Sequence, residues 1–312
     1  MKLSIIVPSY NEEGNILEFN KKVLSVLNDL EYEIIYINDG STDKTLDKIK
    51  KVYEENMNNI KYISFSKNFG KEAAIYAGLK KSTGDFICII DSDLQQNPKY
   101  ILSMLDYLKK NPDTDQIAMV MKNRNKENIF NRLFKQLFYK LINKLSETEF
   151  VDGASDFRMF RKNVKNAVLE LSETNRFSKG IFSWVGFNTE YMYYNVERRF
   201  SGKTKFTTKN QIKYAITGIT NYSIKPLKLS FITGLIISLL SLIYIIITVF
   251  QVLIFGKDVP GYASLLVVSL FMGGLQLIFI GIVGAYLGKN YIETKNRPIY
   301  LEKESKGFDE IL

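Results

Sequence analysis

Histidine is absent from the 312 residues of the chain, and cysteine occurs once, at Cys88. The first absence excludes a histidine general base, histidine metal ligands and a Ser-His-Asp triad. A single cysteine cannot form a disulfide within one chain. Because Cys88 lies in the apolar run Phe86–Ile90, we predict that it is a small core residue. Acid–base chemistry and metal binding therefore fall to carboxylates.

Two phosphate-binding signatures are also missing. The chain contains neither a G-x-G-x-x-G motif nor a Walker loop, which argues against dinucleotide oxidoreduction and P-loop ATP chemistry. No signal peptide is visible, because the first apolar run, Leu3–Val7, is too short for one and is followed by Pro8. We therefore expect the N-terminal part of the chain to stay in the cytosol.

Positive charge exceeds negative charge, with 42 Lys and Arg against 33 Asp and Glu and a net charge of +9. This balance suggests an anionic partner, which is either nucleic acid, an anionic lipid surface or a phosphorylated substrate. The alternative is that the excess lysine only keeps an Asn- and Lys-rich chain soluble. The long apolar runs described next favour lipid and phosphorylated substrates, so we expect no nucleic-acid partner.

Two long uncharged runs dominate the last third of the sequence. One extends from residue 229 to 255 and the other from residue 259 to 288. Each exceeds the roughly 20 residues that a helix needs to cross the hydrocarbon of a bilayer. A buried helical hairpin is the alternative. Because the connection is short, we predict two antiparallel transmembrane helices, at about 229–255 and 263–288.

Basic residues flank the outer ends of this hairpin, whereas the connecting loop carries one lysine and one aspartate. The positive-inside rule then predicts a multi-pass plasma-membrane protein with the N-terminal domain and both termini in the cytoplasm. The predicted organisation is a cytosolic domain at 1–225, the hairpin at 226–290 and a cytosolic tail at 291–312. We expect the charged part of the tail, residues 302–312, to be loosely ordered.

Residues 1–122 alternate between short apolar runs and helical patterns, which predicts βαβ units and an α/β domain with a mostly parallel sheet. The predicted strands are Leu3–Val7, Glu33–Ile37, Lys61–Phe65 and Phe86–Ile90. The predicted helices are Asn15–Leu30, Lys44–Glu55, Lys71–Lys81 and Lys99–Lys110. In such sheets ligands bind at the carboxyl ends of the strands, so the polar motifs at strand ends are the candidate site.

The segment from about 129 to 146 carries its apolar residues on one face of a helix, and its basic residues lie off that face. A basic amphipathic helix rich in Phe and Leu can lie in a membrane interface. An ordinary helix packed on the core is the alternative, and the sequence leaves both open.

Two aspartate motifs carry chemistry. Asp91 and Asp93 follow the fourth predicted strand, where two carboxylates one residue apart present hard oxygen ligands to Mg²⁺ or Mn²⁺. Phosphate oxygens of a substrate usually complete such a site. Asp39 ends the second strand and precedes Gly40. It either belongs to a plain strand-turn-helix cap or holds the base or ribose of a nucleotide.

Taken in order, these and later motifs resemble the family 2 glycosyltransferases of the GT-A fold. The closer similarity is to the polyprenyl-phosphate glycosyltransferases, which include dolichol-phosphate mannose synthases and bactoprenol glucosyltransferases. The segments that carry the resemblance are Ile6–Glu13, Asn38–Asp43, Asn68–Ala74, Gly84–Asp85, Asp91–Gln95, Gly153–Arg158, Trp184–Phe187 and Arg199–Lys205. The resemblance covers the whole chain, and it implies a GT-A nucleotide-sugar-binding domain followed by a two-helix membrane hairpin.

The resemblance also implies roles for matching residues. The nucleotide-sugar-binding residues would be Pro8, Tyr10, Glu12, Asp39, Lys71, Asp91, Gln95, Arg199 and Lys205. Asp91 and Asp93 would hold Mg²⁺ or Mn²⁺, Asp93 and Asp156 would be catalytic, and Arg124 and Arg132 would contact the acceptor phosphate. The family's usual acidic residue after Asp-Leu-Gln is replaced here by Gln96 and Asn97.

The implied reaction is a metal-dependent, inverting transfer of one sugar from a UDP-sugar to undecaprenyl or another polyprenyl phosphate. The product would be a lipid-linked sugar donor for glycosylation of the cell envelope. Glucose is the expected sugar, and UDP-N-acetylglucosamine and GDP-mannose are the alternative donors. A processive polysaccharide synthase is the rival enzyme, but its Q-x-x-R-W signature is absent. The oligomeric state is open, a homo-oligomer included.

The role of Asp156 stays open as well. A phosphate monoester has a second pKa of about 6 and is mostly ionised at pH 7, so a phosphate acceptor hardly needs a base. Asp156 is therefore either a general base, a group that orients the acceptor, or a metal ligand.

Overall fold

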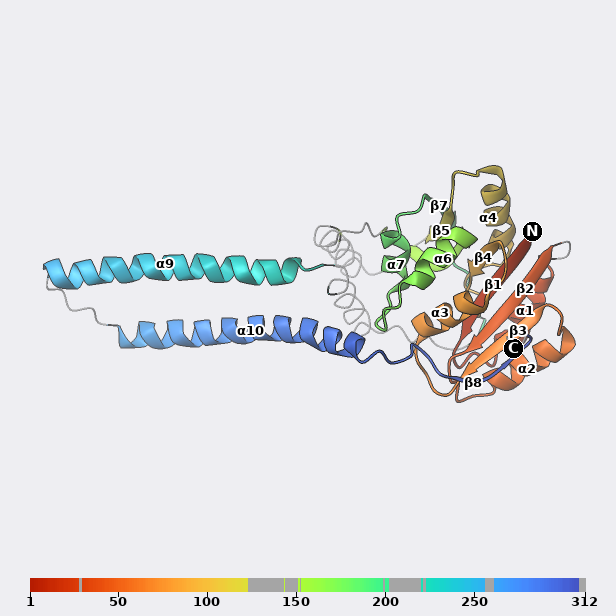
Figure 1. The fold of residues 1–312 in the computed structure, drawn as a ribbon, viewed down its shortest axis with the longest axis horizontal. Coiled ribbons are helices and arrows are strands. Elements are labelled where there is room, and N and C mark those ends of the chain that lie inside the picture. Colours follow the sequence, from red (N-terminus) through yellow and green to blue (C-terminus); the bar gives the residue numbers. More distant parts are fainter. Residues whose placement is uncertain are drawn as a thin grey trace.

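The computed structural model describes residues 1–27, 30–122, 143, 151, 153–198, 200–201, 220, 223–255 and 261–308. It consists of an α/β domain and a pair of long helices that project from one end of it (Figure 1). The amphipathic segment predicted at 129–146 lies, apart from Asn143, outside the described residues.

One eight-stranded sheet forms the centre of the α/β domain, in the order β7-β5-β6-β4-β1-β2-β3-β8. The strands are β1 (Lys2–Ser9), β2 (Glu31–Asn38), β3 (Ile60–Phe65), β4 (Phe86–Ile89), β5 (Gln116–Met121), β6 (Ala154–Arg161), β7 (Thr189–Tyr194) and β8 (Glu302–Lys306). The central strands β4, β1, β2 and β3 run parallel, as do β5 and β7, whereas β6 and β8 are antiparallel to their neighbours. The predicted α/β domain with a mostly parallel sheet is thus confirmed.

Helices cover both faces of this sheet (Figure 1). They are α1 (Ile16–Leu24), α2 (Thr45–Glu55), α3 (Lys71–Lys81), α4 (Lys99–Lys110), α6 (Lys162–Glu170) and α7 (Ser178–Trp184). Apolar residues of α1, α2 and α4 form one core with one face of the strands. Those of α3, α6 and α7 form a second core on the other face. Because side chains alternate across a strand, Ile5 joins the first core and Ile6 the second.

The predicted end of the helix Asn15–Leu30 is wrong, because α1 ends at Leu24. Beyond it the chain forms turns, in which Val26 and Leu27 donate backbone hydrogen bonds to carbonyls three residues earlier, Val23 and Leu24. Leu27 is nevertheless buried, so the apolar pattern that suggested a longer helix reflects core packing of a turn.

The C-terminal tail corrects a second expectation. We expected residues 302–312 to be loosely ordered, but β8 pairs antiparallel with β3 and extends the sheet. Residues 309–312 lie outside the described residues. Ser66 N donates to Leu301 O at 3.0 Å, Lys50 pairs with Glu304 at 2.8 Å, and Tyr300 stacks on Phe65. The sequence Glu-Lys-Glu-Ser-Lys has no apolar alternation, so the strand could not be predicted from the pattern of its side chains. An edge strand can form the backbone hydrogen bonds of the sheet while most of its side chains face water.

The two long helices are α9 (Lys225–Phe255) and α10 (Tyr262–Thr294), and they lie side by side, away from the sheet (Figure 1). Within them, Lys225–Gln251 and Val268–Thr294 have mean hydropathies of 2.6 and 2.0, and their side chains are not buried in the chain. Leu253 is 78% exposed, for example. Both helices are long and apolar enough to cross a bilayer. The hairpin predicted from the sequence is confirmed as a pair of apolar helices, and it associates the protein with a membrane.

Candidate active site

The carboxyl ends of β1, β2 and β4 meet at one edge of the sheet. Ser9 lies opposite Asn38, and Asp39 N donates to Ser9 O at 2.9 Å. Ile90 N, one residue beyond β4, donates to Ile6 O at 3.1 Å. Asp39 and Asp91 therefore leave the sheet at the same edge, where ligands of parallel α/β sheets bind.

Lys71, the first residue of α3, connects two carboxylates from distant parts of the chain. Its Nζ lies 2.7 Å from Asp91 Oδ1 and 2.8 Å from Asp156 Oδ2. Burial alone would lower the pKa of Lys71, but the carboxylates of Asp156 and Asp91 hold it above its ordinary value. Lys71 thus remains a cation between the strand-end aspartate and the third residue of β6.

Asp156 is ionised in this arrangement. Burial would raise the pKa of Asp156, but Lys71, Lys179 and Arg158 together lower it below its ordinary value. Among the described residues, the second carboxylate oxygen, Oδ1, is buried and accepts no hydrogen bond. A buried acceptor without a donor is costly, so this oxygen is suited to receive a donor from a bound substrate.

The Asp-Ser-Asp turn is fixed by its own following residues. Asp91 N donates to Gln96 Oε1 at 3.0 Å, and Gln96 Nε2 donates to Asp91 Oδ2 at 3.2 Å. Gln95 N donates to Asp93 Oδ1 at 3.1 Å, and Leu94 adopts a positive φ of 62° to close the turn. Gln96 therefore orients Asp91.

Asp91 and Asp93 fit a hard divalent cation by donor type, because both present carboxylate oxygens at one turn. Burial raises the pKa of Asp91, which is the cost of keeping this carboxylate away from water. Among the described residues, no group of three His, Cys, Asp or Glu side chains converges on one point. The two aspartates would therefore need oxygens of a bound diphosphate to complete the coordination of a metal.

Asp39 holds the turn that precedes α3. Its carboxylate accepts from Phe69 N at 2.7 Å, from Gly70 N at 3.0 Å and from Asn68 Nδ2 at 3.0 Å. Burial raises the pKa of Asp39 to about 6, although the backbone donors of Phe69 and Gly70 oppose the shift. Gly70, with φ of 97°, leads directly into Lys71. Asp39 therefore positions the start of α3, a role the sequence did not reveal.

The loop after β1 carries the next predicted residues. Pro8 belongs to β1, and Tyr10 follows its last residue. Glu12 N donates to Thr45 Oγ1 at 2.7 Å, and the Glu12 carboxylate accepts from the Asn15 side-chain amide. The bond to Thr45 joins the loop after β1 to the first residue of α2, and Thr42 N, in the loop after β2, donates to Asn11 Oδ1 at 2.8 Å. Tyr10, Glu12 and Asp39 therefore lie at one edge of the sheet.

The structure brings together only part of the predicted set. Lys71, Asp91 and Asp156 are in direct contact, and Asp93 and Gln95 belong to the same turn as Asp91. Arg124, Arg132, Arg199 and Lys205 lie outside the described residues. Sequence reasoning gave no structural role to Gln96 or Glu72, and it did not name Lys179. Lys179 lies on α7 and close to Asp156 of β6, and burial lowers its pKa. No local sequence pattern predicted that this helix lies near the aspartate cluster.

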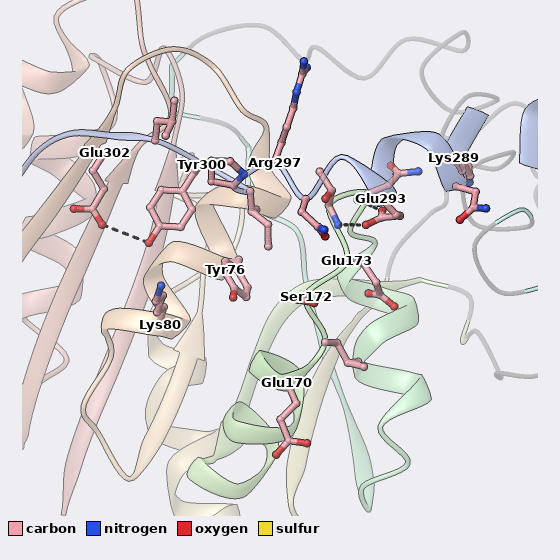
Figure 2. Close-up of a pocket in the computed structure, with 18 of the residues that line it drawn as sticks. Tyr76, Lys80, Glu170, Ser172, Glu173, Lys289, Glu293, Arg297, Tyr300 and Glu302 are labelled. Carbon is pink, nitrogen blue, oxygen red and sulfur yellow. Dashed lines mark hydrogen bonds between the residues drawn. The ribbon is translucent and has the colours of Figure 1, made fainter. Parts of the chain in front are cut away.

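A cavity of about 1010 Å³ lies elsewhere, between α3, the loop after α6 and the end of α10 (Figure 2). Tyr76, Lys80, Glu173, Glu293 and Arg297 are among the residues that line it. Lys71, Asp91 and Asp156 do not. The cavity therefore belongs to the junction between the α/β domain and the membrane hairpin rather than to the aspartate cluster.

A mostly parallel α/β sheet, with an aspartate turn at the carboxyl end of its fourth strand and a carboxylate on β6 facing it, is the architecture of a GT-A glycosyltransferase. Residues 4–169 match the description Glycosyl transferase family 2, and residues 225–289 match the GtrB C-terminal hairpin. The chain belongs to glycosyl transferase family 2.

Relatives match over nearly the whole length. The putative glycosyltransferase CsbB of Bacillus subtilis is 42% identical over 306 residues, which are 97% of this chain and 92% of that protein. The prophage bactoprenol glucosyl transferase homolog of Escherichia coli is 39% identical over 308 residues, 98% of this chain and 100% of that protein.

A solved structure with the same fold is the glucosyl-3-phosphoglycerate synthase from Mycobacterium tuberculosis in complex with Mn²⁺, uridine diphosphate and phosphoglyceric acid. Its TM-score is 0.51 at 16% identity, and the match covers 70% of this chain and 76% of that chain. This likeness confirms the GT-A fold of the α/β domain.

Proposed function

We propose that the protein transfers one glucose from UDP-glucose to undecaprenyl or another polyprenyl phosphate, with inversion at the anomeric carbon. The observation that carries the transfer is the contact of Lys71 with both Asp91 and Asp156, which joins the strand-end motif of the donor side to the β6 motif of the acceptor side. Relatives named bactoprenol glucosyl transferase support the sugar and the lipid. The exposed apolar hairpin supports a substrate that resides in a membrane.

In this reaction an oxygen of the lipid phosphate attacks the anomeric carbon, and the bond from that carbon to the diphosphate breaks. The acceptor is mostly ionised above a pH of about 6, so it supplies its own negative charge. Asp156 is already ionised and paired with Lys71. Asp156 therefore takes no proton from the acceptor. It orients the acceptor through Lys71, whose ammonium group offers positive charge to either phosphate.

Asp91 and Asp93 would hold Mg²⁺ or Mn²⁺ at the donor diphosphate. When bound, such an ion stabilises the negative charge that develops on the leaving diphosphate. Pro8, Tyr10, Glu12, Asp39 and Gln95 would line the nucleotide side of this edge, together with Arg199 and Lys205. Arg124 and Arg132 would contact the acceptor phosphate.

The catalytic domain and both termini would face the cytoplasm. Basic residues flank the outer ends of the hairpin, in line with the positive-inside rule. The pairing of β8 with β3 supports this arrangement, because β3 precedes the hairpin in the sequence and β8 follows it, and both belong to one sheet. Both ends of the hairpin then lie on the same side of the membrane as the catalytic domain.

The test is transfer by membranes that contain the protein. Membranes are incubated with undecaprenyl phosphate and radiolabelled UDP-glucose, UDP-N-acetylglucosamine or GDP-mannose, and the lipid fraction is extracted. We expect label from UDP-glucose in a lipid that carries one sugar, and none with the matched variant Asp93→Asn. Label transferred from another donor would show that the enzyme uses a sugar other than glucose. A labelled polymer would identify a processive synthase, and no transfer from any donor would refute the proposal.

A further inference from the structure

The membrane hairpin is hydrogen-bonded to the α/β domain through Glu293, in the last turn of α10. Its two carboxylate oxygens accept from two successive backbone amides of the loop between α6 and α7. Thr174 N lies 2.9 Å from Oε2, and Asn175 N lies 3.0 Å from Oε1 (Figure 2). Hydrogen bonds that a carboxylate accepts are about twice as strong as neutral ones, so this contact fixes the loop to the helix end.

The same loop is fixed to α3 and leads into α7. The Arg176 guanidinium donates to Leu171 O and Val168 O, and its carbon lies 4.6 Å from the centre of the Tyr76 ring on α3. Two residues later, Ser178 begins α7. A shift of Glu293 would therefore move the loop, and with it the first turn of α7.

Ser178, in the first turn of α7, is hydrogen-bonded to Glu72, the residue that follows Lys71. Ser178 N donates to Glu72 Oε2 at 2.8 Å, and the Ser178 hydroxyl donates to the same oxygen. Glu72 is the second residue of α3, and its neighbour Lys71 carries the contacts to Asp91 and Asp156. An unbroken series of contacts thus runs from the end of α10 through the loop and α7 to the aspartate cluster.

We propose that Glu293 is a positioning residue, through which the membrane hairpin sets the position of Lys71 between Asp91 and Asp156. This inference rests on the proposed function, since Lys71 acts there on the donor and acceptor phosphates. Glu293 lies at the junction between the hairpin and the α/β domain, and it is not part of the cluster of Lys71, Asp91 and Asp156. It places the end of α3 that faces the cluster, so that the geometry for transfer depends on how the hairpin is seated in its bilayer.

The expected effect is on turnover rather than on nucleotide binding. Misplacement of reacting groups by about 1 Å can lower a rate by about 100-fold. We therefore expect Glu293→Ala to lower kcat by about 10-fold or more. Glu293→Gln keeps the shape and one accepting oxygen, and should lower kcat less. The dissociation constant for UDP should rise by less than the loss in kcat, because the Asp39 turn and the Asp91–Gln96 turn keep hydrogen bonds of their own.

Glu304→Gln is the matched control. Glu304 also joins the C-terminal segment to the α/β domain, through Lys50, but it does so at β8 and far from α7. Its replacement should leave kcat unchanged. All variants are full-length and are measured in the same lipid nanodiscs, with wild-type glucose transfer as the reference.

A double-mutant cycle that combines Glu293→Ala with Ser178→Ala tests whether the two residues act through the same series of contacts. If both residues act through one series of contacts, the combined loss in kcat is about that of the larger single loss, whereas independent effects multiply. Multiplied losses would overturn the inference. So would an unchanged kcat in both Glu293 variants, or a fall in kcat matched by an equal fall in the number of UDP sites, which would make the contact merely structural.

Should Glu293→Ala fail to fold, the isosteric Glu293→Gln decides by the same measurements. Failure of the proposed function looks different, because the wild-type protein itself would then transfer no glucose to the lipid.

Discussion

The ammonium group of Lys71 lies 2.8 Å from Oδ2 of Asp156, and this ion pair joins residues that are 85 positions apart in the chain. Lys71 begins α3 and Asp156 lies on β6, so the sheet order, not local sequence, brings them together. The pair holds the pKa of Asp156 below its ordinary value, although burial opposes this. The lowered pKa keeps Asp156 ionised at neutral pH.

The first prediction concerns the pH dependence of Asp156→Asn. Because the pKa of Asp156 is lowered, its carboxyl would titrate only below the ordinary range, and no acidic limb between about pH 6 and 8 should belong to it. With UDP-sugar saturating and lipid phosphate limiting, the variant should lose about 100-fold in rate through misplacement of the acceptor, yet its profile should run parallel to that of the wild type. An acidic limb that vanishes in the variant would restore Asp156 as a base.

Metal removal is the second prediction. If Asp91 and Asp93 hold the cation at the diphosphate, EDTA should abolish transfer, and Mn²⁺ or Mg²⁺ should restore it. A bound metal contributes several kcal/mol of charge stabilisation, which corresponds to at least about 100-fold in rate. Calorimetry should find that Mn²⁺ strengthens UDP binding to the wild type but not to Asp93→Asn. Full activity in EDTA would remove the metal from the mechanism.

Asp39 gives a prediction on nucleotide affinity. Its pKa is raised by burial to about 6 from an ordinary 3.8, so it takes up a proton in the folded protein as the pH falls through 6. A protonated Asp39 no longer holds the amides of Phe69 and Gly70 equally well, and the turn before Lys71 should loosen. We expect UDP binding to weaken between pH 7 and 5, by about 10-fold.

Unfolding would not explain this loss. A raised carboxyl pKa means that the folded state binds the proton more tightly than the unfolded state, so titration of Asp39 stabilises the fold as the pH falls from about 6 toward 3.8. The variant Asp39→Asn should bind UDP weakly at both pH values. An affinity for UDP that is independent of pH in the wild type would contradict the prediction.

The hairpin gives the fourth prediction. Replacement of residues 226–290 by a flexible Gly/Ser linker of about 20 residues removes α9 and most of α10 but keeps β8. This protein should leave carbonate-washed membranes and still bind UDP. Truncation after residue 225 also removes β8 and exposes the edge of β3, so it should aggregate more readily. A linker variant that stays in the membrane after carbonate treatment would show that the hairpin is not the main anchor.

Local sequence determined the features that depend on short spacings. The alternation of apolar runs and helical patterns placed β1 to β4 and α2, α3 and α4 close to their observed bounds, because side-chain period reports directly on secondary structure. The uncharged runs identified α9 and α10, since length and apolarity alone define a helix that can cross a membrane. The Asp91–Asp93 turn was recognised for the same reason, as its donors are one residue apart.

Only the tertiary structure decided which distant groups meet. The partners of Lys71, the hold of Asp39 on the turn before α3, the pairing of β8 with β3 and the contact of Glu293 with the loop before α7 all join residues far apart in the chain. Such contacts arise from the order of strands in the sheet and from backbone groups that must find hydrogen-bond partners once buried. The side-chain periodicity of a single segment does not predict these contacts, because each depends on how distant segments are placed in the folded domain.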